Sequence, residues 1–268
     1  MKQLNSILLL SMLFFVASCD LFEDDDTMGT GDCKVSKASF NIPNDPARGE
    51  TDFVYNSNDQ LTGILSSDWD QGSTPYKTRI QIDYSGDLVS KLSSYSTFMN
   101  DPEEKNFDYE FYYENGELDS VSFNGFNAFE YSDGYYLVEF ESGKPKVIDR
   151  YNYDNFLSQV NHYSRSVLNW DNDNVSSMDV NVIASGSMSR YVYTYDSMKS
   201  PINIVALSFF SGNYYALSKN NILKAEFYLN DALQDTDNFD YSYTDQGYPL
   251  TSQQLPGYPL YNYEYDCN

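Results

Sequence analysis

The sequence has one histidine, three cysteines and few basic residues. Lysine and arginine together number 16 against 40 acidic residues, and the formal net charge is −24. Nucleic acid phosphates are bound by basic surfaces, so this balance excludes a nucleic acid partner. It also disfavours electrostatic docking on anionic lipid. The lone His162 cannot build a site of several histidines, so we predict a solvent-facing strand residue there and neither metal nor cofactor.

The chain also lacks an apolar run long enough to cross a membrane as a helix. The run ILLLSMLFFVA at residues 7–17 has 11 residues, whereas a span needs roughly 20. Its length, with Lys2 before it, is typical of an export signal. The next residues, VASC, are similar to a bacterial lipobox, whose cysteine receives diacylglycerol. We predict a lipoprotein signal at residues 1–18 and lipid attachment at Cys19; a signal cut after Ala17 and Ser18 without lipid is the alternative.

An acidic, glycine-containing segment occupies residues 19–32 and shows no apolar periodicity, which predicts a flexible tether. Acidic residues soon after a lipidated cysteine resemble the surface-export signal of Bacteroidetes lipoproteins, and here they are Glu23, Asp24, Asp25 and Asp26. This resemblance implies an outer-membrane protein that faces the cell surface and touches the membrane through its lipid anchor only. A plain soluble linker is the alternative.

Two cysteines, Cys33 and Cys267, remain if Cys19 carries lipid. Export places them in an oxidising environment, where an even pair usually forms a disulfide. We therefore predict a Cys33–Cys267 bridge, with two free thiols as the alternative. Closing a loop of about 235 residues contributes roughly 5 kcal/mol on the loop-entropy account. The bridge also brings together the two ends of a single predicted domain, residues 33–268.

From residue 53 onward one hairpin pattern recurs. An alternating run ends on an aromatic residue, a turn of Asn, Asp, Gly or Ser follows, and a second run begins, as in FVYNSNDQLTGI and FYYENGELDSV. Alternation is a strand signal because successive side chains point to opposite faces, and Asn-Gly favours a tight hairpin. The aromatic residues expected to open turns are Tyr55, Tyr84, Tyr113, Tyr131, Tyr153, Trp170 and Tyr195. Their gaps of 17 to 29 residues each hold two strands, which puts every tight turn on one rim.

Eight hairpins predict an all-β fold of about 16 strands. Open twisted sheets rarely exceed about 10 strands, and closure removes exposed edges. We predict a large antiparallel meander that forms a closed or nearly closed barrel. We expect it to be soluble rather than membrane-spanning, because charged residues interrupt the strands where a porin has an apolar band. Residues 198–220 are compatible with a short helix or with a plug-like loop.

Four segments carry a family resemblance: YTYDSMKSPINI at 193–204, LSKNNILKAEF at 217–227, YSYTDQGYPLTSQ at 241–253 and YNYEYDC at 261–267. They resemble the tyrosine-rich YD-type repeats of bacterial surface proteins. More closely, with the lipobox, the chain resembles a family of Bacteroidetes lipoproteins of unknown function with a porin-like fold. This implies an antiparallel barrel-like shell and provides no catalytic residue.

The chemistry-bearing residues form no clear constellation. Asp171 and Asp173 have the spacing of a calcium loop, but Ser176 and Val182 stand where an EF-hand has Gly and Glu, so a turn is the better interpretation. Trp170 is expected to end a strand as the tyrosines do. Trp69, in a predicted return loop, is the weak candidate for ligand contact.

We therefore predict a non-enzymatic binding or scaffold module that recognises a glycan or a partner protein. A glycoside hydrolase is one alternative, although 40 acidic residues nominate no particular carboxylate pair. A purely structural envelope component is the other.

Overall fold

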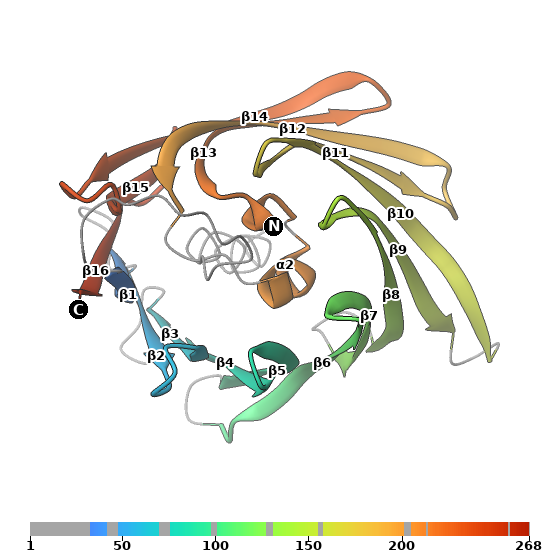
Figure 1. Cartoon of the computed structure of the whole chain (residues 1–268), viewed down its shortest axis with the longest axis horizontal. Coiled ribbons are helices and arrows are strands. Elements are labelled where there is room, and N and C mark those ends of the chain that lie inside the picture. The colour runs from blue at the N-terminus through green and yellow to red at the C-terminus, as the bar shows by residue number, and fades with distance from the viewer. Residues whose placement is uncertain are drawn as a thin grey trace.

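The fold is a closed barrel in which 16 antiparallel strands follow one another in chain order and β16 pairs back onto β1 (Figure 1). This computed structural model describes residues 33–41, 48–69, 76–97, 101–126, 131–154, 158–200, 205–212, 214–256 and 258–267. The predicted meander of about 16 strands and its closure are confirmed. The predicted signal at residues 1–18, Cys19 and the tether at residues 19–32 lie outside the described residues.

The first eight strands are β1 (Cys33–Asn41), β2 (Arg48–Tyr55), β3 (Leu61–Trp69), β4 (Tyr76–Ser85), β5 (Leu88–Thr97), β6 (Glu104–Glu114), β7 (Glu117–Phe126) and β8 (Tyr131–Glu141). The next eight are β9 (Lys144–Asp154), β10 (Gln159–Asp171), β11 (Asn174–Val182), β12 (Ser187–Lys199), β13 (Asn220–Leu229), β14 (Ala232–Tyr243), β15 (Pro249–Leu255) and β16 (Tyr261–Cys267). Helix α2 (Val205–Ser211) and the 3-10 helix η1 (Tyr214–Leu217) lie between β12 and β13.

The alternation in the sequence separates the inner face of the barrel from the outer face. In β2, Gly49, Thr51 and Phe53 are buried while the residues between them are exposed. In β16, Tyr261 and Tyr263 are buried in the same way. A period of two residues fits a strand with one covered face, so each strand contributes every second side chain to the core.

Five of the seven recurrent aromatic residues, Tyr55, Tyr84, Tyr113, Trp170 and Tyr195, lie at one end of the barrel, where each even-numbered strand passes to the next odd-numbered strand. We call this end the aromatic rim. A register shift in the pairing occurs beside each of seven aromatic residues there: Tyr55, Tyr84, Tyr113, Phe140, Trp170, Tyr195 and Tyr243. Bulges of this kind increase local twist, which helps a large sheet to close.

Side-chain donors at the aromatic rim also tie neighbouring hairpins together. Each donates to a backbone carbonyl near the start of the preceding odd-numbered strand: Tyr84 to Leu61 (2.9 Å), Trp170 to Pro145 (2.7 Å), Tyr195 to Val175 (2.8 Å) and Tyr265 to Pro249 (2.7 Å). Buried phenol and indole donors need an acceptor, and here the acceptor belongs to the preceding hairpin. At Tyr84, Trp170 and Tyr195 the aromatic residue therefore both lies at a bulge and ties two hairpins together.

One of the predicted turns is wrong, and another lies on the wrong rim. Tyr131 opens no turn, because β8 continues from Tyr131 to Glu141 and the turn falls at Ser142 and Gly143, both with positive φ. Gly134 serves packing instead: a Cβ there would lie 2.1 Å from the carbonyl oxygen of Tyr151. The connection after Tyr153 joins β9 to β10 and so lies on the opposite rim.

The expectation of tight turns on one rim also fails at β13 and β14. They are joined by Asn230 and Asp231, both with positive φ, on the rim opposite the aromatic rim. Asn and Asp tolerate this conformation, so a two-residue turn forms there as readily as on the aromatic rim.

The lumen is partly filled by α2 and η1, in the region where the sequence left two possibilities open. Figure 1 shows α2 within the ring of strands. Phe209 of α2 is 1% exposed, and its ring centroid lies 6.3 Å from that of Phe111 and 5.4 Å from that of Tyr136. The segment is therefore a short helix and an internal plug together. No helix in the described part of the chain is long and apolar enough to span a membrane.

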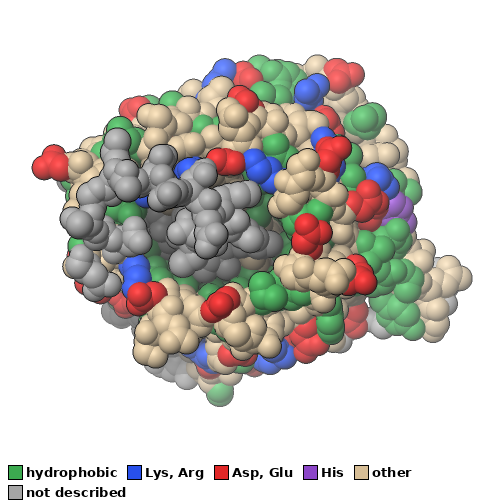
Figure 2. Space-filling model, viewed as in Figure 1, with side chains coloured by type: hydrophobic (Ala, Val, Ile, Leu, Met, Phe, Trp, Pro, Cys, Tyr) green, Lys and Arg blue, Asp and Glu red, His purple; other side chains and the backbone are tan. Residues whose placement is uncertain are grey.

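The outer face is polar, with ion pairs distributed around the barrel. Six of them are Lys37–Glu50, Arg79–Glu103, Lys91–Glu110, Arg165–Asp149, Arg190–Asp179 and Lys224–Glu226. Figure 2 shows acidic and basic side chains interspersed around the visible face. Individual exposed ion pairs contribute little to stability, so their significance here is that they make the outer surface polar.

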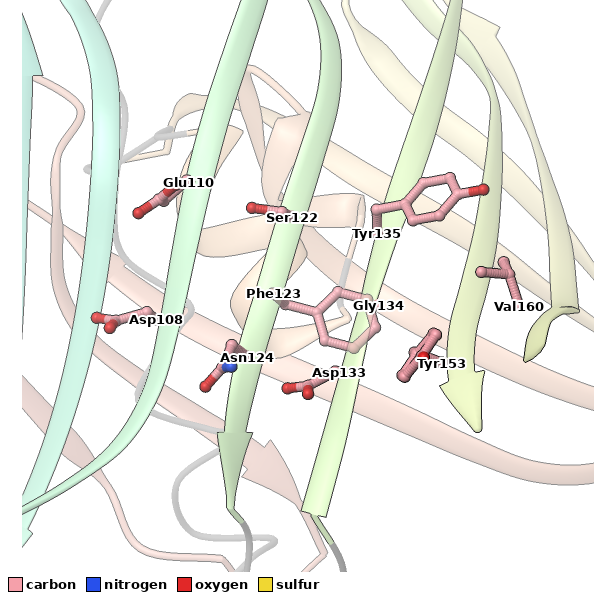
Figure 3. Close-up of a pocket in the computed structure, with 10 residues that line it drawn as sticks. All are labelled: Asp108, Glu110, Ser122, Phe123, Asn124, Asp133, Gly134, Tyr135, Tyr153 and Val160. Carbon is pink, nitrogen blue, oxygen red and sulfur yellow. The ribbon is translucent and has the colours of Figure 1, made fainter. Parts of the chain in front are cut away.

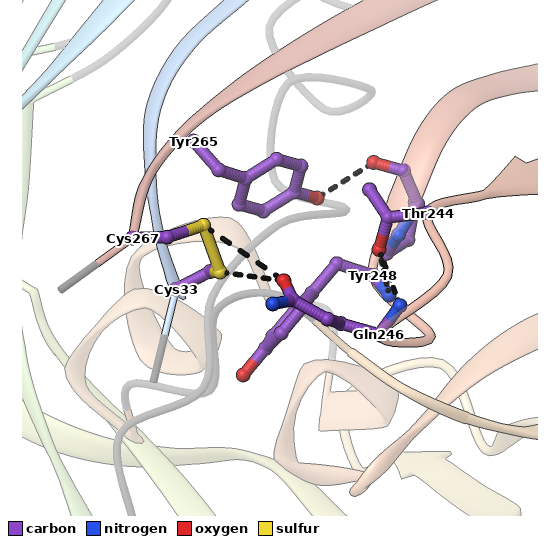
Figure 4. Close-up of a disulfide and its surroundings, with 7 residues drawn as sticks. Cys33, Thr244, Gln246, Tyr248, Tyr265 and Cys267 are labelled. Atoms are coloured by element: carbon purple, nitrogen blue, oxygen red, sulfur yellow. Dashed lines mark hydrogen bonds between the residues drawn. A yellow bond between two sulfur atoms is a disulfide. The ribbon is translucent and has the colours of Figure 1, made fainter. Parts of the chain in front are cut away.

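A disulfide joins Cys33 at the start of β1 to Cys267 at the end of β16, as the cysteine count predicts. Gln246, in the turn between β14 and β15, places Oε1 3.0 Å from the Cys33 sulfur (Figure 4). A disulfide sulfur has no proton to donate, so we treat this as a close polar contact. The bridge closes the β1–β16 seam, so it ties β16 to the wall on one side, while on its other side the described β15–β16 ladder pairs at Thr251–Asn262 and Ser252–Tyr261 alone.

Candidate functional site

A cavity of about 470 Å³ lies inside the barrel beside the internal helical segment. Its volume falls within the range of roughly 300–1,000 Å³ that is usual for small-molecule sites. Six tyrosines from the wall and the plug line it: Tyr136, Tyr191, Tyr193, Tyr214, Tyr215 and Tyr258. The barrel interior is therefore neither fully packed nor an open channel over the described residues; plug and cavity share it.

The tyrosine rings form connected walls. Tyr193 stacks on Tyr191 at 6.4 Å between centroids and meets Tyr215 of η1 at 5.4 Å. Burial raises the pKa of all three phenols above its ordinary value. Their hydroxyls therefore stay protonated at neutral pH and can both donate and accept hydrogen bonds.

Three charged side chains join the tyrosines at the cavity. Asp235 and Asp237 project from the same face of β14, two residues apart. Burial raises the pKa of Asp237, the carboxylate of Asp235 adds to this, and a hydrogen bond donated by Gln254 opposes it. Arg150 comes from β9, where its Nε donates to Asn152 at 2.9 Å and its guanidinium lies 4.8 Å from the Tyr163 ring centroid.

This arrangement suits a small, polar, uncharged ligand. Phenol rings offer apolar faces with a hydroxyl at the edge, the carboxylates accept hydrogen bonds, and Arg150 donates them. Acceptors and donors thus converge on one space with aromatic walls, which is how small-molecule sites fix orientation.

The plug is held in place by hydrogen bonds to the wall at the aromatic rim. Ser218 Oγ accepts from the Val175 amide at 2.9 Å and donates to the Tyr195 hydroxyl at 2.9 Å. The Lys219 amide donates to the Asp173 carbonyl at 3.1 Å. The cavity wall that η1 provides is therefore anchored to β11 and β12.

A second buried polar group faces the lumen on β3. Asp68 is largely buried, its Oδ1 has no hydrogen-bond partner among the described residues, and burial raises its pKa to about 6. The Tyr261 hydroxyl is likewise buried and without a partner in this part of the chain. Asp68 is thus a carboxyl group that the fold favours in its protonated form.

The residues singled out in the sequence do not meet at this cavity. Trp69 is the last residue of β3 rather than part of a loop, which corrects its predicted position, and Arg48 lies 4.9 Å from its ring centroid. Its role as a ligand contact stays a prediction. Trp170 is the penultimate residue of β10, near the strand end as predicted. Asp173 lies in the turn that follows and forms an ion pair with Lys144, with 2.7 Å between Oδ1 and Nζ.

His162 lies on the outer face and is half-buried rather than freely solvated. Its Nε2 is 2.9 Å from Asp149 Oδ1, and its ring stacks on Tyr151 at 4.7 Å. Arg165 binds the other oxygen of Asp149 at 3.1 Å. No group of three or more potential metal-ligating side chains is close enough to hold an ion within the described ranges.

The cavity residues escaped the sequence analysis because they come from eight strands, from β8 to β15, from the plug and from the connection between β15 and β16. The signal for one part of the cavity is present in QDTDNF at residues 234–239, where Asp235, Asp237 and Phe239 alternate onto one face. Acidic residues are unusual on the face of a strand that points into a core. The sequence alone does not show which face points inward, because tertiary packing decides it.

Two of the solved structures that resemble this chain are porin-like proteins. One is a porin-like protein from Bacteroides vulgatus, with a TM-score of 0.57 and 13% identity over 88% of this chain and 99% of that one. Another, from Bacteroides uniformis, has a TM-score of 0.53 and 12% identity over 87% and 96%. No protein-family model matches the sequence, and no curated protein matches it. At this identity the likeness establishes the fold, which agrees with the fold that the family resemblance implied.

Proposed function

We propose that this protein is a lipid-anchored barrel of the bacterial envelope that binds a small saccharide in its lumenal cavity without transforming it. The observation that carries the proposal is the tyrosine-lined cavity of about 470 Å³ with Asp235, Asp237 and Arg150 at its wall. Sugars present apolar CH faces and a rim of hydroxyls, which match aromatic faces and charged hydrogen-bonding groups.

The anchor is proposed from the VASC sequence and the outer surface of the barrel. Ion pairs such as Lys91–Glu110 and Arg190–Asp179 face outward, where a lipid-facing strand would place apolar side chains. A Lys or Arg at the bilayer midplane of a barrel costs about 2–4 kcal/mol. The barrel therefore lies outside the hydrocarbon, and diacylglycerol on Cys19 provides the attachment to the outer membrane, facing the cell surface.

Binding without hydrolysis is favoured by where the carboxylates lie. Asp235 and Asp237 project from one strand, on one side of the cavity. Glycoside hydrolases need an acid and a second carboxylate that flank the bond to be cleaved. The raised pKa of Asp237 is the one feature that favours the hydrolase alternative, so the test must include turnover.

The test is calorimetric titration of the purified protein with a panel of neutral mono- and oligosaccharides. We expect Tyr191→Ala to lower the affinity for the best ligand about tenfold, which corresponds to about 1.4 kcal/mol of binding free energy. The control is Tyr228→Ala, because Tyr228 lies on the outer face of β13 and bonds Glu226. If no saccharide binds, the glycan proposal fails. If the bound sugar releases reducing ends and Asp237→Asn stops this release, the protein is a hydrolase.

A further inference from the structure

A groove on the outer wall lies outside the lumenal cavity and has a different chemistry. It has a volume of about 510 Å³ and crosses β6 to β10 (Figure 3). The residues lining it are partners across the sheet: Asp108 pairs with Asn124, Asn124 with Asp133, and Ser122 with Tyr135. Directly paired residues share a face, and this face is opposite to Phe111 and Tyr136, which contact the internal helix. The groove therefore faces outward.

Side-chain size explains why the groove exists. The outward residues of β7 are short, namely Ser120, Ser122 and Asn124, whereas β6 and β8 carry long ones. β6 and β8 lie two strand spacings apart, about 10 Å, so the trough along β7 is as wide as one extended chain.

The two walls of the groove differ. Asp108 and Glu110 of β6 stand on one side, and Figure 3 shows Tyr135, Tyr153 and Val160 on the other. Tyr153 and Val160 are 42% and 50% exposed, which is high for apolar side chains on neighbouring strands. Tyr135 is held rigidly, because its ring stacks on Tyr151 at 4.9 Å, which in turn stacks on His162.

The carboxylates are incompletely paired on the groove side. Lys91 and Lys105 reach Asp108 from β5 and from β6 itself, at 3.5 and 2.8 Å, and Lys91 reaches Glu110 at 3.5 Å. Asp133, at the end of the groove, has no ion pair among the described residues, and its buried Oδ1 has no hydrogen-bond partner there. Three carboxylates against two lysines leave the groove negative.

We infer that this groove is a docking site for a basic polypeptide segment of a partner protein, which lays lysine or arginine side chains between the acidic wall and the tyrosines. A cationic head pairs with the carboxylates, and its alkyl stem packs on the aromatic wall, where cation–π attraction adds to the binding. The net charge of −24 attracts such a segment from a distance and repels acidic ones. A bare divalent cation uses the acidic wall and leaves Tyr153 without a role.

The experiment is titration of the full-length protein with fluorescein-labelled pentalysine and pentaarginine at low salt, with pentaglutamate as the negative probe. We expect Asp133→Asn and Tyr153→Ala each to weaken binding of the basic peptides at least about fivefold, which corresponds to about 1 kcal/mol. The matched controls are Asp240→Asn, which removes the same charge from the outer face of β14, and Tyr228→Ala. We expect less than a twofold change in either.

Three results overturn the inference. Equal weakening by Asp133→Asn and Asp240→Asn shows that net charge, not the groove, attracts the peptide. Displacement of the peptide by millimolar Ca²⁺, together with unchanged binding in Tyr153→Ala, shows a cation site. The third is the absence of peptide binding to the wild-type protein while circular dichroism shows it folded. The lumenal proposal is unaffected by any of these, because Tyr191 and Tyr153 lie on opposite faces of the wall.

Discussion

Removing the Cys33–Cys267 bridge should destabilise the barrel strongly. The bridge spans 234 residues, nearly the whole described domain. On the loop-entropy account, a cross-link of this length lowers the entropy of the unfolded chain by an amount worth about 5 kcal/mol at 25 °C. Residual structure in the unfolded chain reduces this figure, so we expect Cys33→Ser/Cys267→Ser to lose about 2–5 kcal/mol of unfolding free energy.

The loss should be felt first at one place in the wall. β16 pairs with β1 at seven positions from Cys33–Cys267 to Phe40–Tyr261. On its other side it pairs with β15 at two, and the Tyr265–Pro249 and Ser252–Tyr263 hydrogen bonds add two further ties. Once the bridge is gone, the β15–β16 seam is the easiest part of the barrel to open.

Urea unfolding followed by tyrosine fluorescence measures the effect, with the wild type in the presence of a reductant as a parallel sample. With a slope of about 2–3 kcal/mol/M, the midpoint should fall by about 1–2 M. Amide exchange should accelerate in β16 and stay unchanged in β8 and β9. The reasoning is refuted if unreduced wild type shows free thiols by mass spectrometry, or if the variant unfolds within about 1 kcal/mol of the oxidised protein.

Three further predictions concern a buried acid, a hydrogen-bonded tyrosine at the aromatic rim and the anchor. Burial raises the pKa of Asp68 to about 6, so its contribution to stability is full below about pH 4 and is lost as the pH rises to about 6. The unfolding free energy of Asp68→Asn should therefore exceed that of the wild type by up to about 3 kcal/mol at neutral pH and by less at pH 5. A difference that does not change with pH contradicts this. Tyr195→Phe removes the hydroxyl that joins Val175 and Ser218 and should cost about 1–3 kcal/mol in urea unfolding, against almost nothing for Tyr228→Phe. Cys19→Ala should move the protein from the membrane fraction to the soluble fraction, and retention in the membrane fraction would argue against lipidation.

Much of the architecture could be predicted from local patterns. Alternation sets which side chains share a face, and Asn115-Gly116, with positive φ at both residues, forms the turn that its sequence favours. The errors fell where a local signal had two meanings. Gly134 in YSDGYY looked like a turn glycine, yet it is there because the Tyr151 carbonyl and the Phe123 ring leave no space for a Cβ.

Neither proposed binding site could be predicted from the sequence, for a geometric reason. The lumenal cavity joins Tyr136 to Tyr258, which lie far apart in the chain and meet only because the sheet closes. The outer groove is defined by differences in side-chain length between neighbouring strands, and these emerge only once the register of β6, β7 and β8 is known. A slip of one residue in that register would exchange the inner and outer faces.

The sequence by itself determined the strand-forming segments, the excess of negative charge and the pair of cysteines, because each depends on residue type and on neighbours along the chain. The tertiary structure decided that recurrent aromatic residues such as Tyr84 and Tyr195 lie at bulges and tie hairpins together, that α2 and η1 lie in the lumen, and that Asp235 and Asp237 face inward. Those outcomes depend on which surface the closed sheet covers. Burial is a property of the whole barrel and not of any one strand.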